Sequence, residues 1–218
     1  ATGNWVSLDV PLSDFAGLTT TGHIAQMIIS GDPNTVYLDN IYFYNPSGGG
    51  GGGSAGVIDF EPDGLGASWT WNVFENVDNP PLEFVANPDQ SGANTSATVA
   101  KFTARQAGQP FAGTQTLDKE IFTLDASNAI VKIMVYKSVI SDVGIKFEKG
   151  AASTGEIKVA NTVVNEWEEL TFDFSGVIGP INTDITGLVV FPDFQDGRTS
   201  DNVVYFDNIS FSAVGGGG

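Results

Sequence analysis

The chain of 218 residues has no cysteine, and His23 is its only histidine. The absence of cysteine excludes disulfides, thiolate nucleophiles and cysteine-ligated zinc. Because the histidine lies near the N-terminus, residues 57–213 contain no imidazole that could serve as a general base or a zinc ligand. We therefore expect a protein that is not an enzyme.

Basic residues are scarce as well: 9 lysines and arginines stand against 26 aspartates and glutamates, for a net charge of −17. That charge argues against nucleic acid or an anionic lipid surface as a partner and leaves neutral polymers and cations. Anionic polysaccharides are disfavoured on the same ground, unless Lys137, Lys146 and Arg198 form a local basic patch. No run approaches the roughly 20 apolar residues of a membrane-spanning helix, so we expect no membrane insertion.

One stretch occurs twice, as VYLDNIYF over 36–43 and as VYFDNISF over 204–211. The similarity extends upstream, because WVSLDVPLS at 5–13 aligns with WEELTFDFS at 167–175. This self-similarity predicts a tandem repeat with an incomplete first copy. The expected parts are the C-terminal part of a preceding repeat (1–46), a glycine-rich linker (47–56), a complete domain (57–213) and the start of the next linker (214–218).

The complete domain shows many short runs rich in β-branched and aromatic residues, separated by Gly, Pro, Asn and Asp. This spacing predicts an all-β fold, an antiparallel β-sandwich of the jelly-roll kind. The expected strands cover residues 57–61, 69–76, 82–87, 95–104, 112–117, 128–137, 143–149, 156–160, 166–174, 185–191 and 203–212.

A candidate metal site comes from the two ends of this domain. At strand period, Asp207 shares one apolar face with Tyr205, Ile209 and Phe211, and a buried carboxylate without a partner costs several kcal/mol. If the first and last strands lie side by side, Asp59 and Glu61 approach Asp207, and Asn94 can add an oxygen. Such oxygen ligands suit a structural Ca²⁺. In the alternative, Asp207 bonds neighbouring backbone N–H groups and Glu61 is solvated.

A candidate ligand site starts from Trp69 and Trp71, which alternate on one strand and can stack on sugar rings. In the alternative, one of the two indoles belongs to the core. Polar and aromatic residues on later strands are expected to line the same concave sheet. These further ligand-binding candidates are Tyr136, Lys137, Lys146, Glu148, Phe191, Asp193, Phe194 and Arg198.

Four segments carry a resemblance to a known class of domain: IDFE at 58–61, WTW at 69–71, NPPLE at 79–83 and WEELTFDF at 167–174. With them, the domain resembles the β-sandwich carbohydrate-binding modules of marine Bacteroidetes, which are related in fold to module families four, sixteen and twenty-two. The resemblance implies a jelly roll, a structural calcium and glycan binding on the concave face. Matched by position, the acidic ligands fall on Glu61 and Asp207, and the aromatic platform falls on Trp69 and Trp71.

Two functions follow from these observations. The first is a non-catalytic polysaccharide-binding module of a multimodular extracellular or cell-surface protein, for which the acidic charge favours a neutral β-glucan such as laminarin. The second is a structural repeat of an extracellular fibre or adhesin. In that hypothesis the partial repeat and the glycine segments drive self-association with neighbouring repeats or chains by strand addition.

Overall fold

The computed structural model describes residues 56–122, 124–177 and 185–214, together with Ile29 and Thr35. The chain divides into two units, residues 1–44 and 45–218, and the fold below belongs to the second. The predicted partial repeat and glycine-rich segments lie almost wholly outside the described residues, so the tandem repeat stays a prediction. Within the described part, no helix is long or apolar enough to span a membrane.

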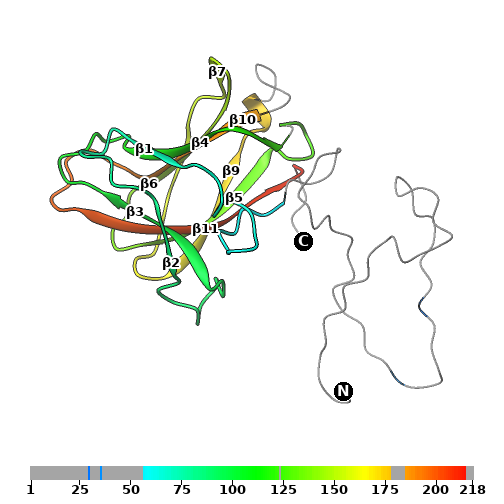
Figure 1. Ribbon diagram of the computed structural model, residues 1–218, viewed down its shortest axis with the longest axis horizontal. Coiled ribbons are helices and arrows are strands. Elements are labelled where there is room, and N and C mark those ends of the chain that lie inside the picture. Colours follow the sequence, from blue (N-terminus) through cyan, green and yellow to red (C-terminus); the bar gives the residue numbers. More distant parts are fainter. Residues whose placement is uncertain (1–28, 30–34, 36–55, 123, 178–184, 215–218) are drawn as a thin grey trace. The chain divides into compact units, whose positions relative to one another are not determined.

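The second unit confirms the predicted all-β, antiparallel β-sandwich, with its strands in two layers (Figure 1). A 3₁₀ helix, η2 (Ser175–Val177), follows β9. One sheet has the order β1-β4-β10-β6-β7, with β8 also paired to β6, and the other has the order β2-β3-β11-β5-β9. The strands of the first sheet are β1 (Asn72–Phe74), β4 (Gly113–Phe122), β6 (Asp142–Lys149), β7 (Ala152–Ser153), β8 (Ile157–Ala160) and β10 (Ile185–Phe194). The strands of the second are β2 (Glu83–Ala86), β3 (Thr98–Ala104), β5 (Ile130–Lys137), β9 (Trp167–Asp173) and β11 (Asn202–Ser212).

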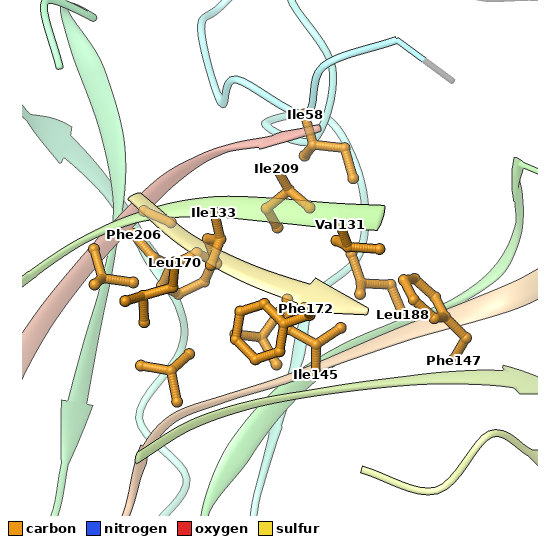
Figure 2. Packing of buried hydrophobic residues seen from close by; sticks show 14 of the residues in the cluster. Ile58, Val131, Ile133, Ile145, Phe147, Leu170, Phe172, Leu188, Phe206 and Ile209 are labelled. Carbon is orange, nitrogen blue, oxygen red and sulfur yellow. The ribbon is translucent and has the colours of Figure 1, made fainter. Parts of the chain in front are cut away.

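The core lies between the two sheets, because alternate residues on each strand point inward. Leu188 of β10 and Phe147 of β6 meet Val131 of β5 and Phe172 of β9, all four with no exposed surface (Figure 2). The inward residues alternate with outward ones, so each sheet also has an outer face. On the six-stranded sheet, that outer face carries the candidate site.

The N-terminal part of the domain differs from the prediction. Residues 57–61 form no strand: only Ile58 makes isolated bridges, to Ile209 and to Leu65. A turn interrupts pairing, because Phe60 has φ +51° and the Asp59 side chain accepts hydrogen bonds from two later backbone N–H groups. The expected strand 69–76 is reduced to β1, and β7 was not predicted. The first and last segments nevertheless lie side by side, as expected, through the Ile58–Ile209 pair.

A β-bulge in β11 corrects the predicted face of Asp207. The register of β11 with β5 shifts between Asp207 and Ser210, and Asn208 has φ +49°. The extra residue restarts the alternation, so that Phe206 and Ile209 both enter the core. Asp207 therefore faces the outer side of its sheet, opposite the side that Ile209 occupies.

Candidate functional site

The outer face of the six-stranded sheet follows from its register. Leu188 and Val190 of β10 lie in the core. Side chains alternate along a strand, so Val189 and Phe191 point to the outer face. Phe191 pairs with Gly144 of β6, and Phe74 of β1 pairs with Gly113 of β4. These pairs form one transverse row across the sheet, which we call the aromatic row: Phe74, Gly113, Phe191, Gly144 and Lys158.

Two glycines make room for the Phe191 ring. A Cβ on Gly144 would lie 3.0 Å from the ring, and one on Gly113 would lie 3.2 Å from it and 2.8 Å from the ring of Phe74. Contacts that short force a neighbour to move. The glycines therefore let Phe191 lie low against the sheet, where it is only 6% exposed.

The aromatic residues form one connected group on this face. The Phe191 ring packs edge to face against Phe74 at 5.8 Å and against Phe194 at 5.7 Å between centroids. Phe111 lines the same hollow and is 42% exposed. Phe191 thus makes a floor, and more exposed aromatic side chains stand around it.

A second transverse row, two residues along each strand, places a polar side chain on either side of Val189. Gln115 of β4 and Lys146 of β6 both pair with Val189 of β10. We call Gln115, Val189 and Lys146 the polar row. The Lys146 ammonium lies 6.0 Å from the centre of the Phe191 ring and 2.6 Å from Glu148 Oε1. The Lys158 ammonium lies 4.2 Å from the centre of the Phe194 ring.

Side chains from the two rows, together with neighbouring residues, line a groove of about 450 Å³. Aromatic rings, an amide, carboxylates and an ammonium group are all within reach of one ligand there. The lining residues are Phe74, Glu75, Phe111, Gln115, Lys146, Glu156, Phe191 and Phe194.

Several predicted ligand-binding residues lie in or beside this groove, and others do not. Lys146, Phe191 and Phe194 line it, and Glu148 is paired with Lys146 at its side. Trp69 and Trp71 precede β1 and do not line it: both are half-buried and pack against the core. The Trp71 indole N–H donates to the Gly66 carbonyl at 2.9 Å. The alternative, in which one of the two indoles belongs to the core, agrees with this placement, and the structure packs both of them against it.

The structure buries Lys137, Asp193 and Arg198 and so corrects their predicted place on the ligand surface. Asp193 accepts a hydrogen bond from Arg198 Nε at 2.7 Å, and Lys137 Nζ lies 3.8 Å from the same carboxylate. Burial lowers the pKa of Lys137 to about 8, against the opposing effect of Asp193. Burial alone would raise the pKa of Asp193, but hydrogen bonds from Ser141 and other neighbours hold it below its usual value. This network joins the sheets inside the sandwich and forms no surface patch.

Tyr136 lies on the opposite sheet from Lys146 and Phe191, which corrects the expectation of one shared surface. Its ring packs edge to face against Trp167 at 5.7 Å and against Tyr205 at 5.9 Å. Trp167 is 7% exposed and donates its indole N–H to Asn87 Oδ1. These aromatics cover the outer face of the five-stranded sheet.

Two of the predicted metal ligands, Asp207 and Asn94, contact each other beside the bulge of β11. Asp207 is fully buried, and its Oδ2 accepts a hydrogen bond from Asn94 Nδ2 at 2.8 Å. Its Oδ1 has no hydrogen-bond partner within the described structure. Burial raises the pKa of Asp207 to about 6. Hydrogen bonding by Ser96 and then by Asn94 opposes that rise, and the negative charge of Asp59 adds to it.

Asp59 and Glu61 make other contacts at this corner. Asp59 Oδ1 accepts from the backbone N–H groups of Glu61 and Leu65. Glu61 Oε1 accepts from the N–H groups of Ala97 and Thr98 at 2.6 and 3.1 Å, so it is not simply solvated. Among the residues that the structure describes, no three Asp, Glu, His or Cys side chains lie close enough together to bind a metal ion.

Five groove residues escaped prediction: Phe74, Glu75, Phe111, Gln115 and Glu156. Phe74 and Gln115 belong to strands whose outward face depends on the register with β10, which no single-strand pattern contains. Phe111 lies in a loop. Glycine inside a strand often marks a close approach of another group, but the contact of Gly113 and Gly144 with Phe191 becomes visible only in the folded chain.

No protein-family model and no curated protein matches the chain. Among solved structures, an exo-β-agarase has a TM-score of 0.54 and 11% identity, over 73% of this chain and 25% of its own. A Clostridium thermocellum xylanase with a family 22 carbohydrate-binding module, solved with xylohexaose, scores 0.45 at 14% identity, over 76% and 29%. A family 22 xylan-binding domain from Paenibacillus barcinonensis scores 0.46 at 14% identity, over 73% and 95%. The chain thus spans about a quarter of the agarase. The predicted resemblance to β-sandwich carbohydrate-binding modules is confirmed as a resemblance of fold.

Proposed function

We propose that the chain is a non-catalytic module that binds a neutral polysaccharide in the groove on the six-stranded sheet. The observation that carries this proposal is the aromatic row beside the polar row. Pyranose rings have apolar C–H faces that pack on aromatic rings, and hydroxyls at their edges that bond to amides, ammonium groups and carboxylates. The groove offers both kinds of contact, side by side.

Charge favours a neutral ligand. The basic patch that would attract an anionic polysaccharide does not form, since Lys137 and Arg198 are buried against Asp193 and Lys146 is paired with Glu148. Glu75 and Glu156 also line the groove. Among neutral glycans, a β-glucan is the class expected from the sequence, and laminarin is the first β-glucan to test.

The test is isothermal titration of the full chain with neutral glucan hexaoses, comparing wild type with Phe111→Ala. Loss of the exposed ring is expected to lower affinity by about tenfold, which is a typical effect of an aromatic contact. Ile140→Ala is the matched control, because Ile140 is 52% exposed and does not line the groove. Saturable binding that Phe111→Ala leaves unchanged would contradict the proposal.

We also propose that a structural Ca²⁺ is held near Asp207. The fit rests on the buried Oδ1 atom without a partner and on the second negative charge of Asp59. Asn94 offers a further oxygen, and Ca²⁺ takes six to eight oxygen ligands, including backbone carbonyls and water. Because no third acidic side chain converges among the described residues, such neutral oxygens would complete the shell. The ion would neutralise Asp207 and tie the start of the domain to β11.

An extracellular, multimodular parent protein fits a glycan-binding role and belongs to this proposal. Several modules on one chain would raise avidity through effective concentration. The fibre hypothesis depends on residues 1–46 and on the glycine segments, which lie almost wholly outside the described residues, and it stays a prediction. Sedimentation of the full chain over a range of concentrations measures self-association directly.

A further inference from the structure

Lys146 and Glu148 form an ion pair at the side of the groove. They are two residues apart on β6, so both side chains point to its outer face, and Lys146 Nζ lies 2.6 Å from Glu148 Oε1. Their side chains are 24% and 23% exposed, which leaves them partly desolvated but open to a ligand. Glu148 pairs with Gly187, which has no side chain to cover it.

The pair combines two groups of opposite hydrogen-bonding character. An ammonium group only donates, an ionised carboxylate only accepts, and a hydroxyl does both. Two hydroxyls on adjacent ring carbons can therefore bridge the pair, one accepting from Lys146 and the other donating to Glu148. Hydroxyls on non-adjacent carbons are farther apart and match an ion pair in direct contact less well.

The position of the pair suits a ring bound on the aromatic row. Gly144, Lys146 and Glu148 lie on the same face of β6, spaced about 6.6 Å apart along the strand. The Phe191 ring lies over Gly144, and the Lys146 ammonium is 6.0 Å from the centre of that ring. A sugar packed beside Phe191 can therefore direct one edge, with its hydroxyls, toward Lys146 in the groove and Glu148 at its side.

We propose that the Lys146–Glu148 pair is a clamp for a vicinal diol and that it selects neutral β-1,4-linked glycans over β-1,3-linked ones. In a β-1,4-linked glucan or xylan, the hydroxyls at C2 and C3 of each residue are free and adjacent. In a β-1,3-linked glucan, the oxygen at C3 is in the linkage in every residue except the non-reducing end, and C2 and C4 are not neighbours. This inference rests on the proposed function, and it replaces laminarin with a 1,4-linked chain as the preferred ligand.

The experiment is isothermal titration of the full chain with cellohexaose and with laminarihexaose, for wild type, Lys146→Met and Glu148→Gln. Wild type is expected to bind cellohexaose at least about tenfold more tightly. Because hydrogen bonds to charged groups contribute most among polar contacts, each substitution should weaken cellohexaose binding about 10- to 100-fold and remove the preference. Lys132→Met is the matched control, since Lys132 and Glu169 form an ion pair at 2.7 Å on the other sheet.

Each outcome decides between the two proposals. Equal or tighter binding of laminarihexaose overturns the clamp and leaves glycan binding intact. A cellohexaose preference that survives both substitutions also overturns it. A flat titration with both sugars, from protein shown to be folded by circular dichroism, overturns the clamp and the proposed function together. Loss of the preference in Lys132→Met would show that the variants act through general charge and would contradict the clamp.

Discussion

Replacing Asp207 by asparagine is expected to stabilise the metal-free protein at neutral pH. Asp207 is fully buried, and its pKa is raised to about 6 from the usual 3.8. Each unit of pKa difference between the folded and unfolded states corresponds to about 1.4 kcal/mol, so ionised Asp207 disfavours the folded state by about 3 kcal/mol. Asparagine removes the charge and keeps an oxygen for the Asn94 contact. Its new amide N–H groups, if left without acceptors, take back about 1 to 2 kcal/mol, which leaves a net gain of about 1 to 2 kcal/mol.

The sign of this effect depends on pH. Because the folded-state pKa is the higher one, Asp207 favours folding most below pH 4, and that contribution is lost as the pH rises through about 6. The gain from Asp207→Asn should therefore be present at pH 7.5 and absent at pH 4. Ca²⁺ should stabilise the wild type at pH 7.5 and have little effect on the variant.

Urea unfolding followed by tryptophan fluorescence measures both quantities, in EDTA at pH 4 and 7.5 and with Ca²⁺ at pH 7.5. A variant that is less stable than the wild type in EDTA by the same amount at both pH values would refute the reasoning about the buried charge. An equal response of both proteins to Ca²⁺ would refute the proposed metal site.

Three further predictions concern other parts of the domain. In Gly144→Ala, the added Cβ would lie 3.0 Å from the Phe191 ring. Urea unfolding should show a free energy of unfolding lower by about 1 to 3 kcal/mol, because the ring must move. Isothermal titration should show weaker glycan binding. Trp71→Ala should lower the free energy of unfolding by about 3 kcal/mol, because the indole packs on the core, and should alter glycan affinity less than Phe111→Ala does. Lys137 has a pKa of about 8 when folded and 10.5 when unfolded, so wild type should gain stability relative to Lys137→Met between about pH 8 and 10.5; parallel stability curves would contradict this.

The sandwich itself was predictable because alternation of apolar and polar residues is a local property. β5, β6, β8 and β9 lie close to the ranges expected from period and turn residues. Residues 57–61 were mistaken for a strand because Ile58 and Phe60 do alternate into the core, while the backbone turns away after the two isolated bridges of Ile58. Burial pattern alone does not reveal whether a neighbouring strand is there to pair.

The candidate site was predictable only in part. Lys146 and Phe191 could be identified on their own strands, but their association with Phe74 and Gln115 depends on the register between strands far apart in sequence. The bulge after Asp207 reversed the face of that carboxylate, and strict alternation contains no sign of it. Asp193 looked like a surface acid because its partners, Lys137 and Arg198, meet it only in the folded chain.

The most direct test of the groove is nuclear magnetic resonance of the ¹⁵N-labelled full chain titrated with cellohexaose. We expect the largest shift changes on the backbone amides of β1, β4, β10 and β6 at the groove, with Gln115, Gly144, Lys146 and Phe191 among them. Amides of the opposite sheet, such as those of Tyr136 and Tyr205, should change little. Changes confined to the opposite sheet or to residues 69–71, or no changes at all, would contradict the assignment of the groove as the ligand site.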